Sequence, residues 1–268
     1  MIFERTQCPI CEGKALTKFL TVSCKAYAAH DPAFPDEKTW LRCEECLHLF
    51  SRLAWTRETF RESLKRPVFG DDDTWDDRRY MNAYDCIRMM NDLLDTPRTR
   101  VLEVGCGKAY LSGAAKDQGL TALALDPHPT FKKYADRIGC SFVGSFIEDF
   151  DAYANDDLYD IITLADVLEH CEDPRQVLRK LPYHAKTILY LSTPLYDLSF
   201  YRVTRWGTMF TVTDHQHFFS IASLYRLVRE EGWEVVHHTI SESYRGCCEW
   251  ILARSSSPAV GSTETGTT

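Results

Sequence analysis

The sequence lacks the features that mark membrane proteins and most nucleic-acid-binding proteins. Its 268 residues hold no run near the roughly 18 apolar residues needed to span a bilayer, so we expect no membrane partner. Arg78-Arg79 and Lys132-Lys133 are isolated basic pairs, and 31 basic against 39 acidic residues give a formal charge of −8. Because a basic surface usually meets a polyanion, nucleic acid is a disfavoured partner.

The N-terminal region also lacks an export signal, since Met1 to Pro9 hold no basic segment followed by an apolar stretch. Eleven cysteines, an odd number, then favour a reducing cytoplasm over a disulfide framework. A hydrophobic fraction of 44% over this length supports one full α/β domain and a small accessory one. The oligomeric state stays open.

Residues 101–108, VLEVGCGK, are the most informative segment. An apolar, β-forming run that contains Glu103 leads into Gly105 and Gly107, and a helical pattern follows. Such a turn lets the polar atoms of a ligand approach bare backbone N–H groups. The dinucleotide fingerprint needs a small residue where Tyr110 stands, which argues against NAD or FAD.

The pattern Glu-x-Gly-x-Gly at a strand end resembles the first motif of class I S-adenosylmethionine-dependent methyltransferases. The resemblance implies that the turn lies under the methionine part of the cofactor, with Glu103 just beneath it. Four further landmarks follow in the family's order across roughly residues 99–254. They are strand 120–126, strand and loop 141–149, strand 159–170 with its "fD-ii-…-vleH" ending, and strand 189–194. The fold implied is α/β, a Rossmann-like parallel sheet with helices on both faces.

These landmarks supply candidate cofactor residues. Asp126, about 20 residues past the first glycine, is placed to accept hydrogen bonds from both ribose hydroxyls, and its alternative role is a turn before Pro127. The resemblance implies that the segment with Phe146 and Glu148 flanks the adenine. Asp166, at the end of the fourth strand, either contacts the cofactor or caps the local helix.

Two C-x-x-C pairs, Cys8/Cys11 and Cys43/Cys46, predict a metal module near the N-terminus. Four thiolates complete a tetrahedral site and leave no open position, which favours a structural zinc; a rubredoxin-like iron and a redox dithiol are the alternatives. An arrangement of two cysteine pairs followed by a methyltransferase core resembles the zinc-bearing branch of the family. That branch includes sugar C-methyltransferases and natural-product enzymes. Those sugar enzymes usually carry a further C-terminal domain of substantial size, which puts a C-methylated sugar in doubt.

Candidates for proton transfer lie in and near residues 214–220, DHQHFFS. This segment resembles the family's "E-H-x-x-[FY]-F-S" element, whose histidine is associated with the catalytic base in the sugar C-methyltransferases. By position His215 matches that histidine, and Asp214 replaces the glutamate. Histidine suits proton removal because its ordinary pKa is near neutrality. His170, after the fourth strand, is a further candidate, and a structural role is the alternative for both histidines.

The pattern divides the chain into a metal module (1–55), a helical lead-in or lid (56–98), a cofactor-binding core (99–254) and a disordered tail (255–268). An aromatic insertion, 195–219, is expected to shape the acceptor pocket. We therefore expect a cytoplasmic, S-adenosylmethionine-dependent methyltransferase with a structural zinc ion. Its acceptor would be a small molecule: a sugar, nucleotide-sugar or secondary metabolite. The alternatives are a zinc-bearing ribosomal RNA methyltransferase and a non-catalytic adaptor that binds the cofactor.

Overall fold

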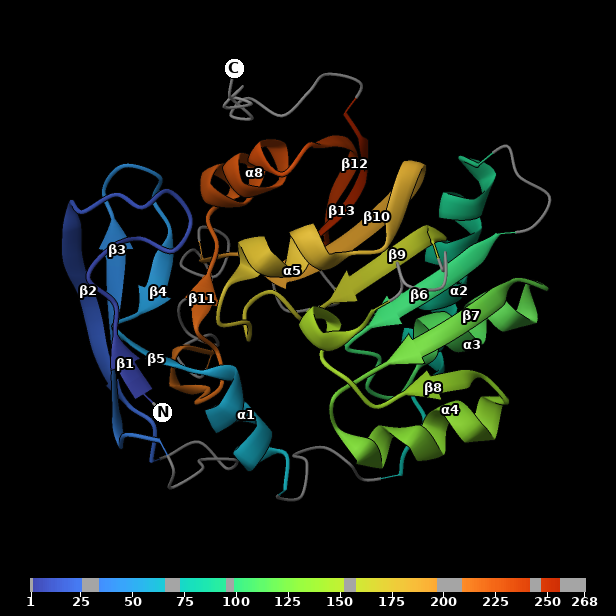
Figure 1. Ribbon diagram of the computed structural model, residues 1–268, viewed down its shortest axis with the longest axis horizontal. Helices are drawn as coiled ribbons and strands as arrows, with labels where there is room; N and C mark the ends of the chain where they lie inside the picture. Colours follow the sequence, from blue (N-terminus) through green and yellow to red (C-terminus); the bar gives the residue numbers. More distant parts are fainter. Residues whose placement is uncertain are drawn as a thin grey trace, which may run out of the picture.

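A seven-stranded sheet forms the centre of the molecule in the computed structural model (Figure 1). The structure describes residues 2–25, 34–65, 73–94, 99–151, 158–196, 209–241 and 247–255. In spatial order the strands are β12 (Trp233–Ser241), β13 (Cys247–Arg254), β10 (Tyr183–Pro194), β9 (Tyr159–Ala165), β6 (Arg100–Val104), β7 (Thr121–Leu125) and β8 (Ser141–Val143). The strands from β8 to β10 are parallel, and β13 is antiparallel to both of its neighbours.

Helices cover both faces of this sheet, as the Rossmann-like prediction required (Figure 1). Among the described residues, three helices pack together on one face and two helices cover the other. The helices are α2 (Asp77–Asp92), α3 (Tyr110–Asp117) and α4 (Lys132–Ile138) on the first face, and α5 (Pro174–Lys180) and α8 (Ile221–Glu230) on the second. Short 3-10 turns are η1 (Pro129–Phe131), η2 (Ile147–Asp149) and η4 (Met209–Thr211).

Alternating side chains of the buried strands explain why both faces must be covered. Val101 and Ile161 point into the cluster formed with α2 and α3, whereas their neighbours Leu102 and Ile162 join the cluster beneath α5 and α8. All four side chains are fully buried. Successive residues of a strand face opposite sides, so a strand that is apolar at every position requires two apolar layers.

The N-terminal module is a second, smaller sheet that is completed by a strand from the core. Its strands are β2 (Leu16–Ser23), β3 (Glu37–Cys43), β4 (Leu49–Ser51) and β11 (His217–Phe218), beside the separate pair β1 (Ile2–Glu4) and β5 (Leu53–Trp55). β11 pairs with β4 through His217 opposite Phe50 and Phe218 opposite Leu49. The insertion predicted to shape a pocket thus also builds the module.

Two parts of the sequence prediction are extended by the structure. The lead-in helix begins at Asp77, because Asp76 caps it by accepting the N–H groups of Arg78 and Arg79. A further helix, α1 (Arg57–Ser63), follows the module. Of the insertion's aromatics, Tyr196 and Phe210 pack near Phe19 of the module. Phe200, Tyr201, Trp206 and the tail 256–268 lie outside the described residues.

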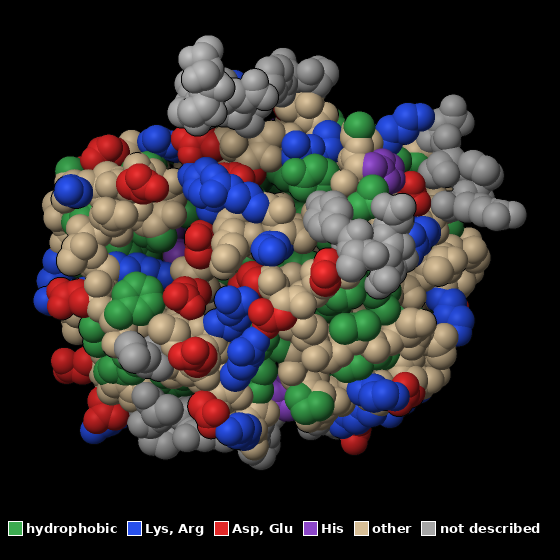
Figure 2. Space-filling view, in the orientation of Figure 1, with side chains coloured by type: hydrophobic (Ala, Val, Ile, Leu, Met, Phe, Trp, Pro, Cys, Tyr) green, Lys and Arg blue, Asp and Glu red, His purple; other side chains and the backbone are tan. Residues whose placement is uncertain are grey.

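The surface carries both signs of charge. On the face shown in Figure 2, acidic and basic side chains are interspersed rather than gathered by sign. Within the described residues, no helix combines the length and apolar character needed to cross a membrane.

We expect the module and the core to unfold together. Phe218 is fully buried against Trp40, Leu49 and Phe210, so Phe218→Ala should lower the free energy of unfolding by about 3–5 kcal/mol. Tyr225→Ala, at a side chain that is 45% exposed on α8, should change it by less than about 0.5 kcal/mol. Urea unfolding followed by far-UV circular dichroism checks both. A separate early transition for the module in Phe218→Ala, with the main transition unchanged, would contradict the shared core.

Candidate active site

The turn after β6 leaves open space above its backbone. Gly105 (φ 66°) and Gly107 (φ 49°) both adopt left-handed backbone conformations that favour glycine. A Cβ on Gly105 would lie 2.6 Å from Cγ2 of Val167, whereas a Cβ on Gly107 would meet nothing within 4 Å. The first glycine is therefore required for packing, and the second leaves open space beside its Cα.

Glu103 lies beneath this turn and holds the start of α3. Its carboxylate accepts the backbone N–H groups of Leu111 (3.3 Å) and Ser112 (2.7 Å), and its side chain is buried. A carboxylate at a helix N-terminus satisfies otherwise unpaired donors. Burial nevertheless raises the pKa of Glu103 to about 7. The printed hydrogen bonds of Glu103 thus go to backbone amides at the start of α3.

Asp126 follows β7 and joins two neighbouring loops. One carboxylate oxygen accepts the N–H of Gly107 (3.0 Å) and the other accepts the N–H of His128 (2.8 Å). The residue is only 6% exposed, and burial raises the pKa of its carboxyl. Each oxygen keeps a lone pair for a second donor. The side chain lines the cavity described next, as the ribose role demands.

A cavity of about 420 Å³ lies outside the carboxyl ends of the strands. One wall carries Asp126 with Phe146 and Glu148, the predicted adenine segment, and burial raises the pKa of Glu148. Trp55 and Phe60 of the N-terminal region also line the cavity. The Phe60 and Phe146 rings meet edge to face at 6.1 Å, so α1 packs against the predicted adenine segment.

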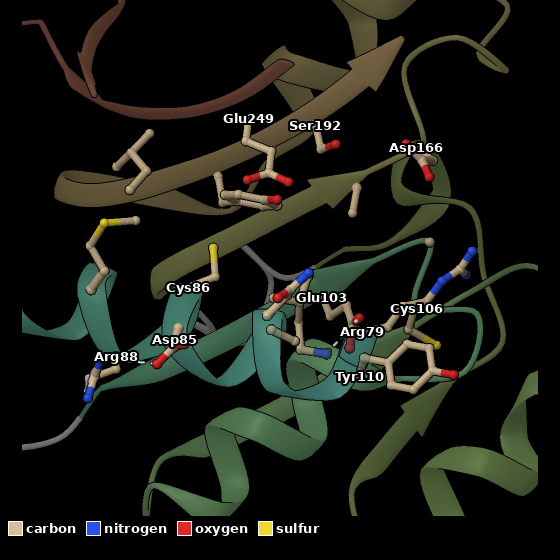
Figure 3. Close-up of a pocket in the computed structure, with 18 of the residues that line it drawn as sticks. Arg79, Asp85, Cys86, Arg88, Glu103, Cys106, Tyr110, Asp166, Ser192 and Glu249 are labelled. Atoms are coloured by element: carbon tan, nitrogen blue, oxygen red, sulfur yellow. Dashed lines mark hydrogen bonds and ion pairs between the residues drawn. The ribbon is translucent and has the colours of Figure 1, made fainter. Parts of the chain in front are cut away.

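A wider cleft of about 1200 Å³ opens on the other side of the glycine turn (Figure 3). Gly105, Gly107 and Asp166 line both spaces. In Figure 3, Arg79 on α2 and Tyr110 at the start of α3 lie beside the turn, with Asp166 across from them. One elongated ligand can therefore pass over the turn from the cavity into the cleft.

Asp166 occupies a specialised position at the end of β9. Its backbone is left-handed (φ 55°), and its N–H donates to the carbonyl of Ser192 on β10 (2.9 Å). The cap of the following helix α5 is Asp173, which accepts the N–H groups of Arg175 and Gln176. Asp166 therefore does not cap α5, and it lines both the cavity and the cleft.

Four side chains that can carry a charge or a proton gather beyond Asp166. Nδ1 of His170 lies 3.4 Å from Oδ2 of Asp214, and the rings of His170 and His215 meet edge to face at 4.7 Å. Potential ligand atoms of Glu169, His170 and His215 lie within 4.8 Å of one another. The sequence predicted Asp214, His170 and His215 from separate segments, and the fold brings them together.

The surroundings set a distinct protonation state for each member of this cluster. Loss of solvent opposes the charged form of His170, but Asp214, Glu169 and Asp166 outweigh it and raise the pKa of His170 to about 9. The pKa of Asp214 is lowered: burial opposes its charged form, but His170 and His215 stabilise it. Burial and the neighbouring His170 lower the pKa of His215 well below 6.5. At neutral pH the cluster therefore pairs an imidazolium with a carboxylate beside a neutral imidazole.

Glu169 is the fourth member of the cluster and lies in the segment that follows β9. It is almost fully buried, accepts the hydroxyl of Thr193 (3.0 Å), and burial raises its pKa to about 8. Its backbone carbonyl accepts the N–H groups of Gln216 (2.7 Å) and His217 (3.1 Å). The residue thereby links the end of β9 to the loop that carries His215.

The four predicted metal-ligating cysteines converge on one point. The Sγ–Sγ distances are 3.5 Å for Cys8–Cys46 and 3.5 Å for Cys11–Cys43, and all four sulfurs lie within 4.8 Å of one another. The two C-x-x-C turns have the same backbone geometry. The residue that follows each cysteine pair, Glu12 or Leu47, has a φ of 60°. Its N–H returns to the carbonyl of the first cysteine at 2.9 Å in both. This arrangement can hold one tetrahedral metal ion.

Several residues that line the two spaces were not predicted from the sequence. Trp55, Phe60 and Arg57 reach the cavity from the N-terminal region, and Arg79 reaches the cleft from α2. None of them belongs to a strand-end motif, and only the packing of separate segments brings them to the site.

Comparisons with known proteins agree with this architecture. A methyltransferase-domain family model matches residues 74–238, more than half of the chain, so the chain belongs to that family. The fold and the glycine turn define a class I S-adenosylmethionine-dependent methyltransferase domain. The zinc-bearing branch remains a prediction.

Curated relatives match only part of the chain. The ubiquinone biosynthesis O-methyltransferase of Rickettsia typhi is 29% identical over 98 residues, which cover 34% of this chain and 39% of that protein. The enzyme of the same name from Vibrio parahaemolyticus is 35% identical over 86 residues, 30% of this chain and 36% of that protein. The matched part thus spans less than two fifths of these relatives.

Solved structures share the fold at low identity. A Burkholderia thailandensis 1,6-didemethyltoxoflavin-N1-methyltransferase, with its acceptor and S-adenosylhomocysteine bound, has a TM-score of 0.58 at 15% identity. The match covers 79% of this chain and 97% of that one. A plantazolicin methyltransferase with S-adenosylhomocysteine has a TM-score of 0.56 at 13% identity, covering 73% and 95%.

The His170–Asp214 pair predicts a pH-dependent stability. The pKa of folded His170 is about 9, above its ordinary 6.5, so its contribution is complete below pH 6.5 and is lost as the pH rises through 9. Asp214→Asn should therefore destabilise the chain by about 1–2 kcal/mol at pH 6.5, a figure reduced for solvent screening, and by less at pH 9.

Urea unfolding at the two pH values measures this difference. Asp85→Asn, which removes an exposed ion pair with Arg88 on α2, is the matched control and should show a small, constant effect. An equal loss of stability in Asp214→Asn at both pH values would contradict the ion pair.

Proposed function

We propose that the protein transfers a methyl group from S-adenosylmethionine to a small molecule. The observation that carries the proposal is Asp126, a nearly buried carboxylate that joins the glycine turn to a cavity at the sheet edge. Membership of the methyltransferase-domain family and the S-adenosylhomocysteine in structural neighbours support the same cofactor. When bound, the cofactor supplies an electrophilic methyl group on a sulfonium.

The residues present fit each part of that cofactor. The 420 Å³ cavity would take the adenosine, with the ribose hydroxyls donating to the remaining lone pairs of Asp126 and the adenine beside Phe146 and Glu148. The methionine part would cross the open space over Gly107 into the cleft. There the guanidinium of Arg79 complements its carboxylate, and Asp166 its ammonium group.

Within the cluster, His215 would remove the proton of the acceptor. Its pKa lies well below 6.5, so the ring is neutral and able to accept a proton at neutral pH, and its buried Nδ1 has no hydrogen-bond partner among the described residues. Asp214 stays ionised and would stabilise the imidazolium that forms. His170, held protonated, would stabilise negative charge that develops on the acceptor.

The acceptor is best matched by a small molecule such as a sugar, nucleotide-sugar or secondary metabolite. The cavity of about 420 Å³ is within the range of about 300–1,000 Å³ that small-molecule sites have, and the wider cleft adjoins it. The mixed charges of Figure 2 do not favour a long polyanion such as ribosomal RNA. His170, Asp214 and Asp166 all line the cavity, and the reacting atom would lie among them.

The cysteine cluster would hold a structural zinc ion in a reducing cytoplasm. Zn–S bonds of about 2.3 Å place tetrahedral sulfurs about 3.8 Å apart, close to the 3.5 Å between paired sulfurs here. Four thiolates fill the coordination shell, so the ion would stabilise the module and take no part in the chemistry.

Loss of the Asp126 carboxylate should abolish most cofactor binding. Each hydrogen bond to a charged group is worth about 1.5–3 kcal/mol, so Asp126→Ala should weaken S-adenosylhomocysteine binding at least about tenfold in calorimetry. Asp136→Ala, on the exposed face of α4, is the control and should bind like the unchanged protein. Failure of the unchanged, metal-loaded protein to bind S-adenosylhomocysteine would reject the proposed function.

The proposed base predicts a separation of turnover from binding. His215→Ala should reduce methyl transfer from labelled S-adenosylmethionine to small molecules of a cell extract by about 10²–10⁴-fold. The affinity for S-adenosylhomocysteine should stay within a few-fold, because His215 does not line the adenosine cavity. An unchanged transfer rate in His215→Ala would assign this histidine a structural role only.

The metal should be required for stability. Metal analysis should find about one zinc per chain, and Cys43→Ser should lower the metal content and the thermal midpoint together. Cys140→Ser, outside the cluster, should leave both nearly unchanged. Iron in place of zinc would identify a rubredoxin-like site.

A further inference from the structure

A buried lysine of the N-terminal module contacts the loop that carries the proposed base. Lys38, on β3, is only 7% exposed. Its ammonium donates to the backbone carbonyls of Val212 (2.7 Å), Thr213 (2.9 Å) and His215 (2.6 Å). An ammonium group has three N–H donors, and here all of them reach one loop.

The surroundings of the ammonium keep it in place. It lies 5.1 Å from the centre of the Trp40 ring and 6.0 Å from that of Trp55, distances at which an aromatic ring attracts a cation. Burial lowers the pKa of Lys38 to about 8, and Asp214 and Cys24 oppose this. The three carbonyls replace the water that the ammonium group lost on burial.

The three carbonyls lie on both sides of Asp214 along the chain. A backbone that turns around one cation at residues 212, 213 and 215 fixes the direction of the side chains between them. The Asp214 carboxylate then faces His170 at 3.4 Å, and the His215 ring packs on His170 at 4.7 Å. His170 belongs to the core, so Lys38 holds the part of the loop that faces a core side chain.

The module also holds the other end of the loop. Arg5 donates to the carbonyl of Gln216 (3.4 Å) and to that of Glu172 (2.8 Å), and the Gln216 side chain accepts the N–H of Trp55 (2.9 Å). β11 then pairs with β4. The loop is therefore anchored to the module both before and after His215.

We propose that Lys38 is a positioning residue of the active site, through which the cysteine module sets the orientation of Asp214 and His215 against His170. The chemical consequence rests on the proposed function, whereas the geometry of the cluster does not. The module would then contribute to the geometry of the active site as well as to the stability of the fold.

The test follows the protonation of His170 in the full-length, metal-loaded chain. Histidine side-chain NMR at about pH 6 to 7.5, where the Lys38 ammonium is charged, should show a protonated His170 ring throughout in the unchanged protein, with the signal assigned from a His170→Gln spectrum. In Lys38→Met the loop should relax, Asp214 should leave His170, and the His170 titration should move down toward 6.5, into this pH range. Removing a positive charge alone would move the titration upward, so a downward shift reports the lost alignment.

Hydrogen exchange and matched variants complete the experiment. The amides of Gln216 and His217, which donate to the Glu169 carbonyl, should exchange at least tenfold faster in Lys38→Met, with α3 unchanged. Lys25→Met removes an exposed ion pair of the same module and should alter neither readout. If Lys38→Met does not fold, Lys38→Gln, which keeps two N–H donors, should give smaller shifts in the same direction.

Two results would overturn the proposal. One is a folded Lys38 variant in which His170 titrates at the unchanged or a higher pH; the other is unaltered exchange at Gln216 and His217. Calorimetry with S-adenosylhomocysteine on the same samples separates the hypotheses. Absent cofactor binding with a shifted His170 titration would reject the proposed methyl transfer but retain the positioning role of Lys38.

Discussion

The pairing of β11 with β4 is the constraint on which the rest of this structure depends. A two-residue strand from the core completes the sheet of the N-terminal module. Because this contact joins positions far apart in the sequence, the module packs against the core along one continuous apolar cluster that includes Phe50, Leu191 and Phe219. Trp55 and Phe60 can then line the cavity, and the loop with His215 can lie beside His170.

Electrostatics divides the site into two regions with different tasks. Around the glycine turn, Glu103 and Asp126 are buried carboxyl groups whose negative charge is met by backbone N–H groups. In the histidine cluster, charges are met by other side chains, and His170 with Asp214 forms a pair that stays ionised at neutral pH. The first region suits the binding of a hydroxyl-rich, zwitterionic ligand. The second suits proton transfer next to it.

The structure also relates the cysteine cluster to the chemistry. Cys43 ends β3, the strand that carries Lys38, and Cys46 precedes β4, the strand that pairs with β11. A metal ion that fixes these two strands would fix the contacts on either side of His215. A metal ion bound by the four cysteines could thus hold the loop with His215 in place through β3 and β4, although that loop contributes no cysteine.

Much of the site could be predicted from the sequence because its parts stand at strand ends. Gly105, Gly107 and Asp126 come directly after apolar runs, and parallel strands bring their carboxyl ends to one edge. The cysteine spacing predicted one cluster, and the sulfurs converge as expected. Lys38, Trp55 and Arg79 could not be found in this way, since each stands in a segment whose local pattern resembles an ordinary strand or helix.

The sequence by itself determined the order of the parallel strands, the glycine turn and the paired cysteines, because apolar periodicity and residue spacing act over short stretches. Only the tertiary structure decided that residues of the module line the cavity, and that Asp173 caps α5 while Asp166 lines the cavity. It also decided that the Lys38 ammonium donates to three backbone carbonyls of the loop that carries His215. Those features arise from burial and charge shared between distant segments, and no local pattern encodes which segments will meet.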